Sequence, residues 1–398
     1  MKILHTADWH TRDRDIDECE KCLAFLVNTA KTEAVDLIVI AGDIFDSQEI
    51  KLDSKAARLT IATVSELSNA APVAIVTGTP SHDGKAPEIL RYCRSMKHDV
   101  FVAIYPQQVY LQEGLIYDRP AGEGDFQEPD LILTFVPQPT KQFYQTSLGI
   151  VAADQEMGAA MSTLFASFGA RAAEYHAPHI LIYHGAVSGC RWANGQIRTG
   201  MDIEVSLDQM ELGNFDLGCL GHIHSAQKLG NKYFYPGPLY ATKIDECEAK
   251  GFYIHDLTGG AIASIFYETP ATRTIRLVAD LALGDMIDRD REALTCQDGD
   301  MAGAKVRIEL TVWQDEIGLL DKLRIAEHYK SLGALEVDIR ITALPRENVR
   351  AEAVLNAITL RQEIEEMAKL RGEEVSADIS AKADLLENGG VEITHGRG

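Results

Sequence analysis

The chain begins with a regular exchange between short apolar runs and longer segments with helical periodicity. Runs with the length of buried strands occupy residues 2–7, 36–41, 73–77, 131–136 and 179–183. Helical periodicity fills the segments between them, at residues 19–31, 54–69, 86–96 and 154–174. Strands that alternate with helices in this way predict an α/β layer fold in which most strands are buried on both faces.

The pattern changes after residue 207, where helical periodicity becomes rare. Short strands separated by Gly and Pro are expected at residues 216–220, 232–235, 251–257 and 261–267, which favours sheet-on-sheet packing. Pro270 is taken as the boundary of this first domain. Beyond it, the pattern predicts a small α+β domain over residues 271–345, with strands at 274–279, 305–313 and 335–341 and helices at 285–294 and 316–330.

The last segment, residues 346–398, has a third pattern. A long helix is expected over residues 347–370, because apolar residues recur at Val349, Ala353, Ile358, Leu360, Ile364, Met367 and Leu370. A shorter helix is expected over residues 379–386. A helix hairpin with no large domain to pack on is typical of an element that docks onto a partner.

The charge of the chain narrows the class of function. A formal net charge of -22 repels phosphate backbones at long range, which argues against an autonomous nucleic-acid binder with a basic patch. A nuclease remains compatible with this charge, because divalent cations neutralise acidic ligands locally and a basic partner can hold the DNA. The acidic surplus also has a simpler explanation, which is that it keeps the protein soluble.

Cysteine usage and the N-terminus favour a cytoplasmic protein. The seven cysteines lie between Cys19 and Cys296 and are odd in number, so no disulfide framework is expected. Cys19 and Cys22 lack a second pair at zinc-site spacing, so they are expected to be ordinary helix residues, with a redox pair as the alternative. The start MKILHTADWH has no long apolar run, and no run elsewhere reaches ~18 residues, so neither a signal peptide nor a membrane span is expected.

Asp and His residues follow five of the predicted strands. They are Asp8 and His10, Asp43, His82 and Asp83, His184, and His222 and His224. The carboxyl ends of strands are where ligands bind in open α/β sheets, so these five loops are expected to meet at one crevice. Carboxylates combined with imidazoles suit Mn, Fe or Zn better than an all-oxygen calcium or magnesium cage.

A single His or Asp after a strand is more often a capping or turn residue than a metal ligand. Five independent strand ends make a shared metal site the stronger interpretation. Two metals about 3.5–4 Å apart and bridged by a carboxylate would clamp a phosphate ester, and Asp43 is the candidate for the bridge. The remaining histidines follow no such pattern and are expected to have structural or surface roles: His5, His98, His176, His179, His255, His328 and His395.

These segments resemble the calcineurin-like metallophosphoesterases. The resemblance rests on HTADWH, AGDIFD, TGTPSHD, YHG and GHIH, followed by YPGPLY and KGFYIHDL. The order and wording are similar to those of SbcD-type nuclease subunits, which act in DNA repair with an SMC-like ATPase. Specific motifs cover about residues 1–258, and the rest is similar in arrangement alone. The resemblance implies a four-layer α/β/β/α sandwich over residues 1–270, an α+β capping domain over 271–345 and a helical tail over 346–398.

The resemblance also implies two divalent metal ions, with Mn²⁺ expected first and Mg²⁺, Fe²⁺ or Zn²⁺ as alternatives. One metal would be held by Asp8, His10, His224 and the shared Asp43, and the other by Asp43, His184, His222 and a residue of the 78–83 loop. A hydroxide activated by the two metals would attack the phosphodiester. His82 would steady the phosphate or protonate the leaving oxygen, and Asp83 would orient His82 by accepting its other ring proton.

The 78–83 loop departs from the family pattern, which is Gly-Asn-His-Asp with the Asn amide oxygen on the second metal. This chain reads Gly78-Thr79-Pro80-Ser81-His82-Asp83 and has no Asn there. Ser81 directly precedes His82, so it is the predicted substitute ligand. Because a hydroxyl is a weaker metal donor than an amide oxygen, the second metal is expected to bind through Ser81 or a water, and less tightly than the first.

The leading hypothesis is a metal-dependent DNA nuclease with endonuclease and exonuclease activity, in a DNA repair and recombination complex. The tail would dock onto an SbcC-type SMC-like ATPase, and the family resemblance implies a homodimer built from helices near residues 54–69 and 86–96. One alternative keeps the site but makes the chain a phosphodiesterase or phosphatase acting on nucleotides or phosphoproteins. Another alternative is a scaffold protein whose site has decayed.

Overall fold

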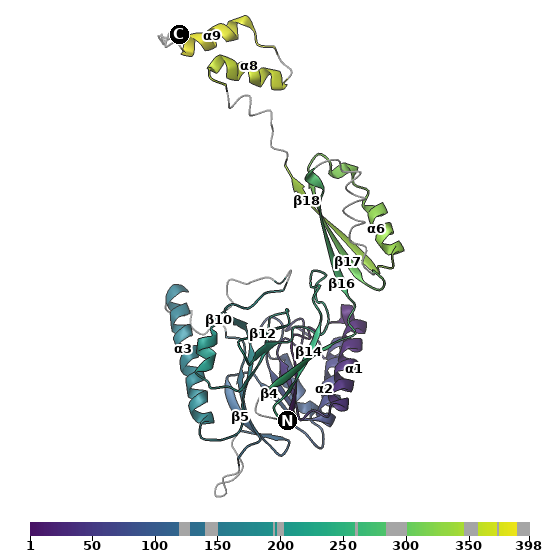
Figure 1. Cartoon of the computed structure of the whole chain (residues 1–398), viewed down its shortest axis with the longest axis vertical. Helices are drawn as coiled ribbons and strands as arrows, with labels where there is room; N and C mark the ends of the chain where they lie inside the picture. The colour runs from purple at the N-terminus through teal and green to yellow at the C-terminus, as the bar shows by residue number, and fades with distance from the viewer. Residues whose placement is uncertain are drawn as a thin grey trace. The chain divides into compact units, whose positions relative to one another are not determined.

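A computed structural model describes residues 1–118, 128–139, 150–193, 196, 203–258, 262–283, 301–345, 357–371 and 374–387 (Figure 1). The chain divides into two units by its internal contacts. The first unit comprises Met1–Leu277, Asp298–Ile308 and Leu323–Ile339, and the second comprises Val278–Gln297, Glu309–Lys322 and Arg340–Gly398.

The first sheet has six strands in the order β15-β14-β1-β2-β3-β4. Their bounds are β1 Lys2–Thr6, β2 Leu37–Ala41, β3 Val73–Val76, β4 Val100–Ala103, β14 Gly251–Asp256 and β15 Ala263–Glu268. Strands β1 to β4 are parallel, whereas β14 and β15 add an antiparallel edge. Every residue of β2, LIVIA, is buried, so this strand is covered on both faces, as an uninterrupted apolar run predicts.

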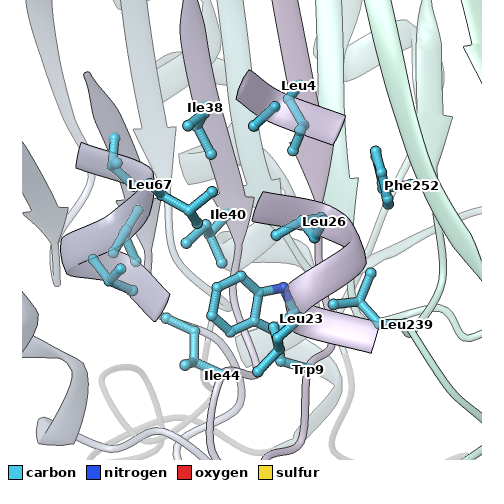
Figure 2. Packing of buried hydrophobic residues seen from close by; sticks show 14 of the residues in the cluster. Leu4, Trp9, Leu23, Leu26, Ile38, Ile40, Ile44, Leu67, Leu239 and Phe252 are labelled. Atoms are coloured by element: carbon cyan, nitrogen blue, oxygen red, sulfur yellow. The ribbon is translucent and has the colours of Figure 1, made fainter. Parts of the chain in front are cut away.

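Two long helices cover the outer face of this sheet, α1 (Ile16–Thr32) and α2 (Lys55–Ala70). Figure 2 shows Trp9, Leu23, Leu26 and Ile40 packed together in the layer between helix and sheet. The indole of Trp9 also donates a hydrogen bond of 2.9 Å to Thr6 Oγ1, so its polar atom is satisfied within this core. Full burial of each such apolar side chain contributes ~1.5–3 kcal/mol.

The second sheet has seven strands in the order β12-β13-β11-β8-β7-β5-β6. Their bounds are β5 Gln107–Gln112, β6 Leu115–Tyr117, β7 Leu131–Val136, β8 His179–His184, β11 Leu217–Gly221, β12 Gln227–Leu229 and β13 Tyr233–Tyr235. Its outer face packs on α3 (Ile150–Ala172) and α4 (Leu207–Glu211) through Phe165 and Met210. Its inner face meets the first sheet in a separate apolar layer that includes Val39, Leu133 and Ile180. The predicted four-layer α/β/β/α sandwich is therefore confirmed.

A three-stranded sheet and a helix hairpin complete the regular structure. Strand β17 (Lys305–Trp313) lies between β16 (Thr274–Asp280) and β18 (Glu336–Leu344), and α6 covers Lys322–Ser331. The hairpin consists of α8 (Leu360–Arg371) and α9 (Ala377–Glu387), which are joined by an ion pair of 2.9 Å between Arg361 and Asp384. The remaining short elements are η1 Asp13–Asp15, η2 Ala86–Cys93, η4 Leu281–Leu283, η5 Ile317–Leu319, β9 Ala186–Val187 and β10 Glu204–Val205.

Three predicted helices differ from the structure or lie outside it. Residues 86–96 form a 3-10 helix over Ala86–Cys93, and the Ser95 hydroxyl then accepts the backbone N–H of His98 where the chain turns away. The helix expected over 347–370 begins only at Leu360 within the described residues, because Thr359 accepts the Gln362 N–H and caps its start. Residues 346–356 and the helix expected over 285–294 lie outside the described residues.

Cys19 and Cys22 are free and buried on α1, as expected for helix residues. Burial raises the pKa of both thiols, that of Cys22 to about 12. A reactive cysteine needs a lowered pKa, so the redox alternative is disfavoured. Within the parts of the chain that the structure describes, none of the helices has the length and apolarity needed to cross a membrane.

Truncation of one residue in the helix-facing core tests this packing. We expect Leu26→Ala to lower the free energy of unfolding by ~2–5 kcal/mol, because Leu26 is fully buried and its removal leaves a cavity. Leu52→Ala is the matched control, since Leu52 is 62% exposed, and its effect should stay within about 0.5 kcal/mol. Denaturant unfolding of both variants measures the difference, and equal effects would contradict the packing described.

Candidate metal centre

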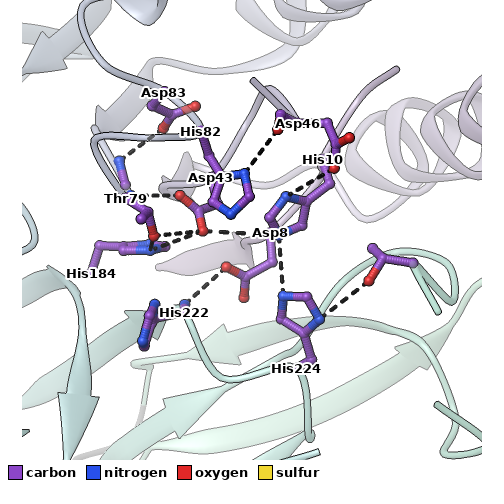
Figure 3. Close-up of polar contacts among 12 residues, drawn as sticks. Asp8, His10, Asp43, Asp46, Thr79, His82, Asp83, His184, His222 and His224 are labelled. Atoms are coloured by element: carbon purple, nitrogen blue, oxygen red, sulfur yellow. Dashed lines mark hydrogen bonds and ion pairs between the residues drawn. The ribbon is translucent and has the colours of Figure 1, made fainter. Parts of the chain in front are cut away.

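The carboxyl ends of strands from both sheets bring the predicted Asp and His residues together (Figure 3). The first sheet supplies Asp8 and His10 after β1, Asp43 after β2 and the 78–83 loop after β3. The second sheet supplies His184 at the end of β8, and His222 and His224 after β11. The crevice predicted from five strand ends is therefore present in the structure.

The backbone at this crevice adopts conformations that side chains other than Gly rarely take. The φ angles are positive at Asp8 (53°), His10 (43°), Asp43 (50°) and His222 (100°). Hydrogen bonds from Asp8 N to Gly42 O (2.9 Å) and from His10 N to Asp43 O (3.0 Å) hold two of these loops against each other. Each such conformation costs about 1–3 kcal/mol, and this kind of strain concentrates at functional sites.

Two glycines allow the loops to approach one another so closely. A Cβ at Gly78 would lie 2.2 Å from Asp43 Oδ1, which is far inside van der Waals contact. A Cβ at Gly42 would lie 2.3 Å from His184 Nδ1, and the φ of Gly42 is also positive, at 84°. Both positions therefore require Gly for the site to keep its shape.

The first cluster consists of Asp8, His10 and His224, whose ligand atoms lie within 4.8 Å of one another. His10 Nε2 and His224 Nε2 are 3.1 Å apart, and Asp8 Oδ1 accepts the His222 backbone N–H at 2.9 Å. Asp8 Oδ2 and His10 Nδ1 are buried and have no hydrogen-bond partner among the described residues. Buried polar atoms are rarely left in this state, so the cluster fits a bound cation.

The second cluster consists of Asp43, His184 and His222, again with ligand atoms within 4.8 Å. His184 Nδ1 lies 2.7 Å from the carbonyl oxygen of Ala41, to which it donates, so His184 Nε2 faces Asp43 Oδ2 at 3.3 Å. Asp43 Oδ2 also lies 3.9 Å from His10 Nε2. Asp43 is therefore positioned between the two clusters, where a bridging carboxylate would be needed.

Burial and neighbouring charges set the protonation of these groups in the metal-free chain. Burial raises the pKa of Asp8 to about 6 and holds that of His10 well below its usual value. Burial also disfavours the charged form of His184, but the charge of Asp43 outweighs it and raises the pKa of His184 to about 9. Asp43 pairs with His184, so its pKa lies well below the usual range despite its burial. A proton on His184 thus occupies the position that a metal would take.

The donor set fits divalent metals of the Mn, Fe and Zn kind. Each cluster offers one carboxylate and two imidazoles, all buried. At least one imidazole of each cluster is oriented through its other ring nitrogen, His184 by the Ala41 carbonyl and His224 by Glu246. Such outer hydrogen bonds accompany most metal-ligating histidines.

The 78–83 loop places Thr79, and not Ser81, beside the second cluster. Thr79 Oγ1 donates to Asp43 Oδ2 at 3.0 Å and lies 3.4 Å from His184 Nε2. Ser81 is exposed, and its backbone oxygen accepts the N–H of Gln48 at 3.1 Å. The sequence favours Ser81 because it precedes His82, but Thr79 directly follows Gly78, as Asn follows Gly in the family loop. That adjacency is the signal that would have identified Thr79.

The prediction that Asp83 orients His82 is wrong. Asp83 is fully buried and accepts three backbone N–H groups, from Ile44 (2.9 Å), Phe45 (3.1 Å) and Gly78 (2.8 Å). His82 Nδ1 pairs instead with the carbonyl oxygen of Asp46 at 2.9 Å. A carboxylate that accepts three N–H groups has little capacity left for an imidazole. Asp83 therefore joins the loops after β2 and β3 and fixes the backbone on either side of Asp43.

Asp46 is a residue of the site that sequence reasoning missed. Its Oδ1 lies 3.8 Å from His10 Nδ1 and 3.2 Å from an Arg12 guanidinium nitrogen, and its carbonyl holds His82. His10, Asp46 and His82 form a third grouping with ligand atoms within 4.8 Å, adjacent to the first cluster. The motif AGDIFD contains Asp46 three residues after Asp43, so the residue was visible but had no assigned role.

A separate grouping of His5, Cys219 and His255 lies outside the crevice. His5 Nε2 pairs with the Leu220 carbonyl at 3.1 Å, His5 Nδ1 with His255 Nε2 at 3.3 Å, and His255 Nδ1 with Ser264 Oγ at 2.8 Å. These bonds use every ring nitrogen of both histidines, and burial lowers the pKa of both. The two residues have the structural role expected from the sequence, and His395 lies outside the described residues.

Metal uptake should depend on pH differently at the two clusters. His184, with a pKa of about 9, holds a proton at neutral pH that a metal must displace, whereas Asp8, with a pKa of about 6, has already lost its proton. We expect the affinity of the second cluster to rise about tenfold per pH unit up to about pH 9, and that of the first to level off above about pH 6.

Calorimetric titration with Mn²⁺ between about pH 6 and pH 9 measures both affinities. In the metal-free chain, the raised pKa of His184 stabilises the fold fully below the unfolded value of 6.5, and this stability is lost as pH rises through about 9. Two affinities with the same pH dependence would contradict the assignment of this proton to His184.

Comparison with known proteins supports the motifs and the geometry. Residues 1–226 match the family model for calcineurin-like phosphoesterases. The SbcD component of the nuclease SbcCD from Staphylococcus epidermidis is 25% identical over 265 residues, which are 65% of this chain and 66% of that protein, just under two thirds of its length. The structure titled "GAP50 the anchor in the inner membrane complex of Plasmodium" aligns at 12% identity and a TM-score of 0.44, over 68% of this chain and 85% of that one. Since the family model covers more than half of the sequence, the chain belongs to the calcineurin-like phosphoesterase family.

Proposed function

We propose that this chain is a metal-dependent nuclease that hydrolyses phosphodiester bonds in DNA, as the nuclease subunit of a repair and recombination complex. The observation that carries the proposal is the pair of buried Asp and His clusters with Asp43 between them. Membership of the calcineurin-like phosphoesterase family supports hydrolysis of a phosphate ester. The similarity to a component of the nuclease SbcCD supports DNA as the substrate.

In this proposal the two clusters hold two divalent ions, with Mn²⁺ as the first expectation. One ion is assigned to Asp8, His10, His224 and Asp43, and the other to Asp43, His184, His222 and Thr79. When bound, the ions activate a water and neutralise charge on the phosphate. Thr79 offers a hydroxyl where the family has an amide oxygen, which supports the expectation that the second ion binds less tightly.

His82 is the proposed proton donor to the leaving oxygen. Its Nδ1 is held by the Asp46 carbonyl, so Nε2 is the nitrogen left to exchange a proton with substrate. Its ring meets that of His10 edge-on, with centroids 4.7 Å apart, which places it beside the first cluster. His82 is only half-buried and is therefore accessible from the crevice.

The regions that follow the family match favour DNA over a small substrate. We propose a nuclease domain over residues 1–270, a capping domain over 271–345 and a partner-docking tail over 346–398. The net charge of -22 suits an enzyme whose grip on DNA comes largely from its partners. A phosphodiesterase or phosphatase of nucleotides or phosphoproteins has no evident use for these added regions. A decayed scaffold is disfavoured because the predicted Asp and His ligands are all present and brought together.

Replacement of Asp43 tests the proposed chemistry. We expect Asp43→Ala to lose bound Mn²⁺ and to reduce cleavage of linear DNA, circular single-stranded DNA and a chromogenic diester by at least about 100-fold, because even residues that only support ligands cost 10–100-fold. Asp53→Ala, at an exposed turn, is the control and should behave as wild type. Cleavage of the chromogenic diester without either DNA would favour the phosphodiesterase alternative, and an active Asp43→Ala would refute the metal mechanism.

We further propose that the α8–α9 hairpin docks onto an SbcC-type SMC-like ATPase. The hairpin exposes four large apolar side chains, Met367 (50% exposed), Ile379 (46%), Leu385 (54%) and Leu386 (58%). Isolated apolar residues on a surface are common, but four on one short hairpin suit a helical element that packs into a partner's groove. The printed description of the similar protein, as a part of SbcCD, supports this kind of partner.

The docking proposal predicts a loss of binding when this apolar surface is made acidic. We expect Leu385→Asp combined with Leu386→Asp to weaken binding of the full chain to the purified ATPase by at least about 30-fold, as is typical of apolar interface anchors. Hydrolysis of a chromogenic diester should stay unchanged. Leu52→Asp, on an exposed turn in the first unit, is the control. Equal affinities for the variant and its control would contradict docking through the hairpin.

A homodimer and a cytoplasmic location remain predictions. Tyr92 (77% exposed) and Met96 (103%) lie in and just after η2, within the 86–96 segment predicted to form the dimer together with residues 54–69, and they support an interface there. The cysteines in the described part of the chain are free, which supports a reducing compartment.

A further inference from the structure

Glu246 is a buried carboxylate directly behind His224 and has no role in the chemistry proposed above. It is 1% exposed and lies in the segment between β13 and β14. Glu246 Oε1 lies 2.7 Å from His224 Nδ1. Since an ionised carboxylate only accepts hydrogen bonds, His224 Nδ1 carries the proton that this contact requires.

Two further residues hold Glu246 in place. Thr242 donates to it twice, from its hydroxyl to Oε1 at 2.9 Å and from its backbone N–H to Oε2 at 3.2 Å. Lys250, which is 5% exposed, pairs with Oε2 at 2.9 Å and also donates to the His224 carbonyl at 3.2 Å. The buried negative charge is thus compensated, and its two oxygens have fixed directions.

This arrangement leaves only one nitrogen of His224 for a ligand. With the proton on Nδ1, the lone pair is on Nε2, which lies 3.1 Å from His10 Nε2 and so points into the first cluster. A neutral backbone carbonyl, that of Ala41, orients His184 in the second cluster. The first cluster therefore has a histidine supported by a charged acceptor, and a charged acceptor increases the basicity of the imidazole.

A purely structural role for Glu246 makes different predictions. As a buried salt bridge with Lys250, Glu246 would affect the stability of the segment between β13 and β14 but would leave the proton of His224 free to occupy either nitrogen. Glu248, two residues further on, provides the comparison. Its Oε1 accepts the Ser225 hydroxyl at 3.2 Å, and Ser225 directly follows His224.

We propose that Glu246 is a positioning residue that fixes the tautomer and orientation of His224, and thereby sets the affinity of the first cluster for its divalent metal. The proposal rests on the metal centre proposed above. Lys250 and Thr242 act through Glu246, by neutralising and directing its carboxylate.

The test uses the full chain with Glu246→Gln, and with Glu248→Gln as the matched control. We expect Glu246→Gln to lower the Mn²⁺ affinity of the first site by about 10–100-fold in calorimetry and to leave the second site unchanged. Histidine ¹⁵N–¹H spectra of the metal-free protein should show His224 as the Nδ1–H tautomer in wild type and in Glu248→Gln, and as a mixture in Glu246→Gln. Thr242→Val, a milder change, should give a smaller loss of affinity in the same site and serves if Glu246→Gln does not fold.

An unchanged His224 tautomer and unchanged Mn²⁺ affinity, with only a lower melting temperature, would overturn the proposal and leave Glu246 as a structural salt bridge. A wild-type protein that bound no Mn²⁺ would overturn the proposed function and, with it, the effect on affinity. The tautomer in the metal-free spectra would then still decide whether Glu246 positions His224.

Discussion

The buried carboxylate of Asp43 is the group around which the site is built. It lies 3.3 Å from His184 of the second sheet and 3.9 Å from His10 of the first, so it joins the two halves of the sandwich at one point. A buried charge is costly unless its partners are held in place, because it gives up its hydration. The positive φ angles, the loop glycines and the hydrogen bonds from Thr79 all supply that placement. The chemistry of the crevice therefore depends on backbone geometry as much as on ligand identity.

The layers of the fold make this geometry stable. The apolar layer between the sheets and the layer beneath α1 and α2 hold the strands on both faces, so the strand ends are fixed before any loop conformation is considered. Strained loops are stable only when the structure around them determines their path. A site assembled from both sheets thus benefits from a core that lies directly beneath it.

Much of the fold and the site could be predicted, and the misses have physical causes. Alternating apolar runs identified the main strands, but β5 was missed because it carries buried Gln side chains, such as Gln108, whose amide donates to Thr134. The ligand types could be read from strand ends, since spacing and chemistry are local. The partners of those ligands could not, because Glu246 and Asp46 reach the site only through the folded chain. Thr79 and Ser81 were confused for the same reason, since loop conformation and not sequence adjacency decides which hydroxyl reaches Asp43.

The three backbone hydrogen bonds to Asp83 have a consequence for how this loop can vary. Gly78 at one end is held against Asp43, and Asp83 at the other end is held against the loop after β2, so both ends of the segment are anchored independently. Pro80 and Ser81 lie between these anchors and are exposed. The chain can therefore lengthen or change in the middle of the loop while the groups beside the phosphate keep their positions. Variation in this stretch is a change at the rim of the crevice, separated from the chemistry by its own anchors.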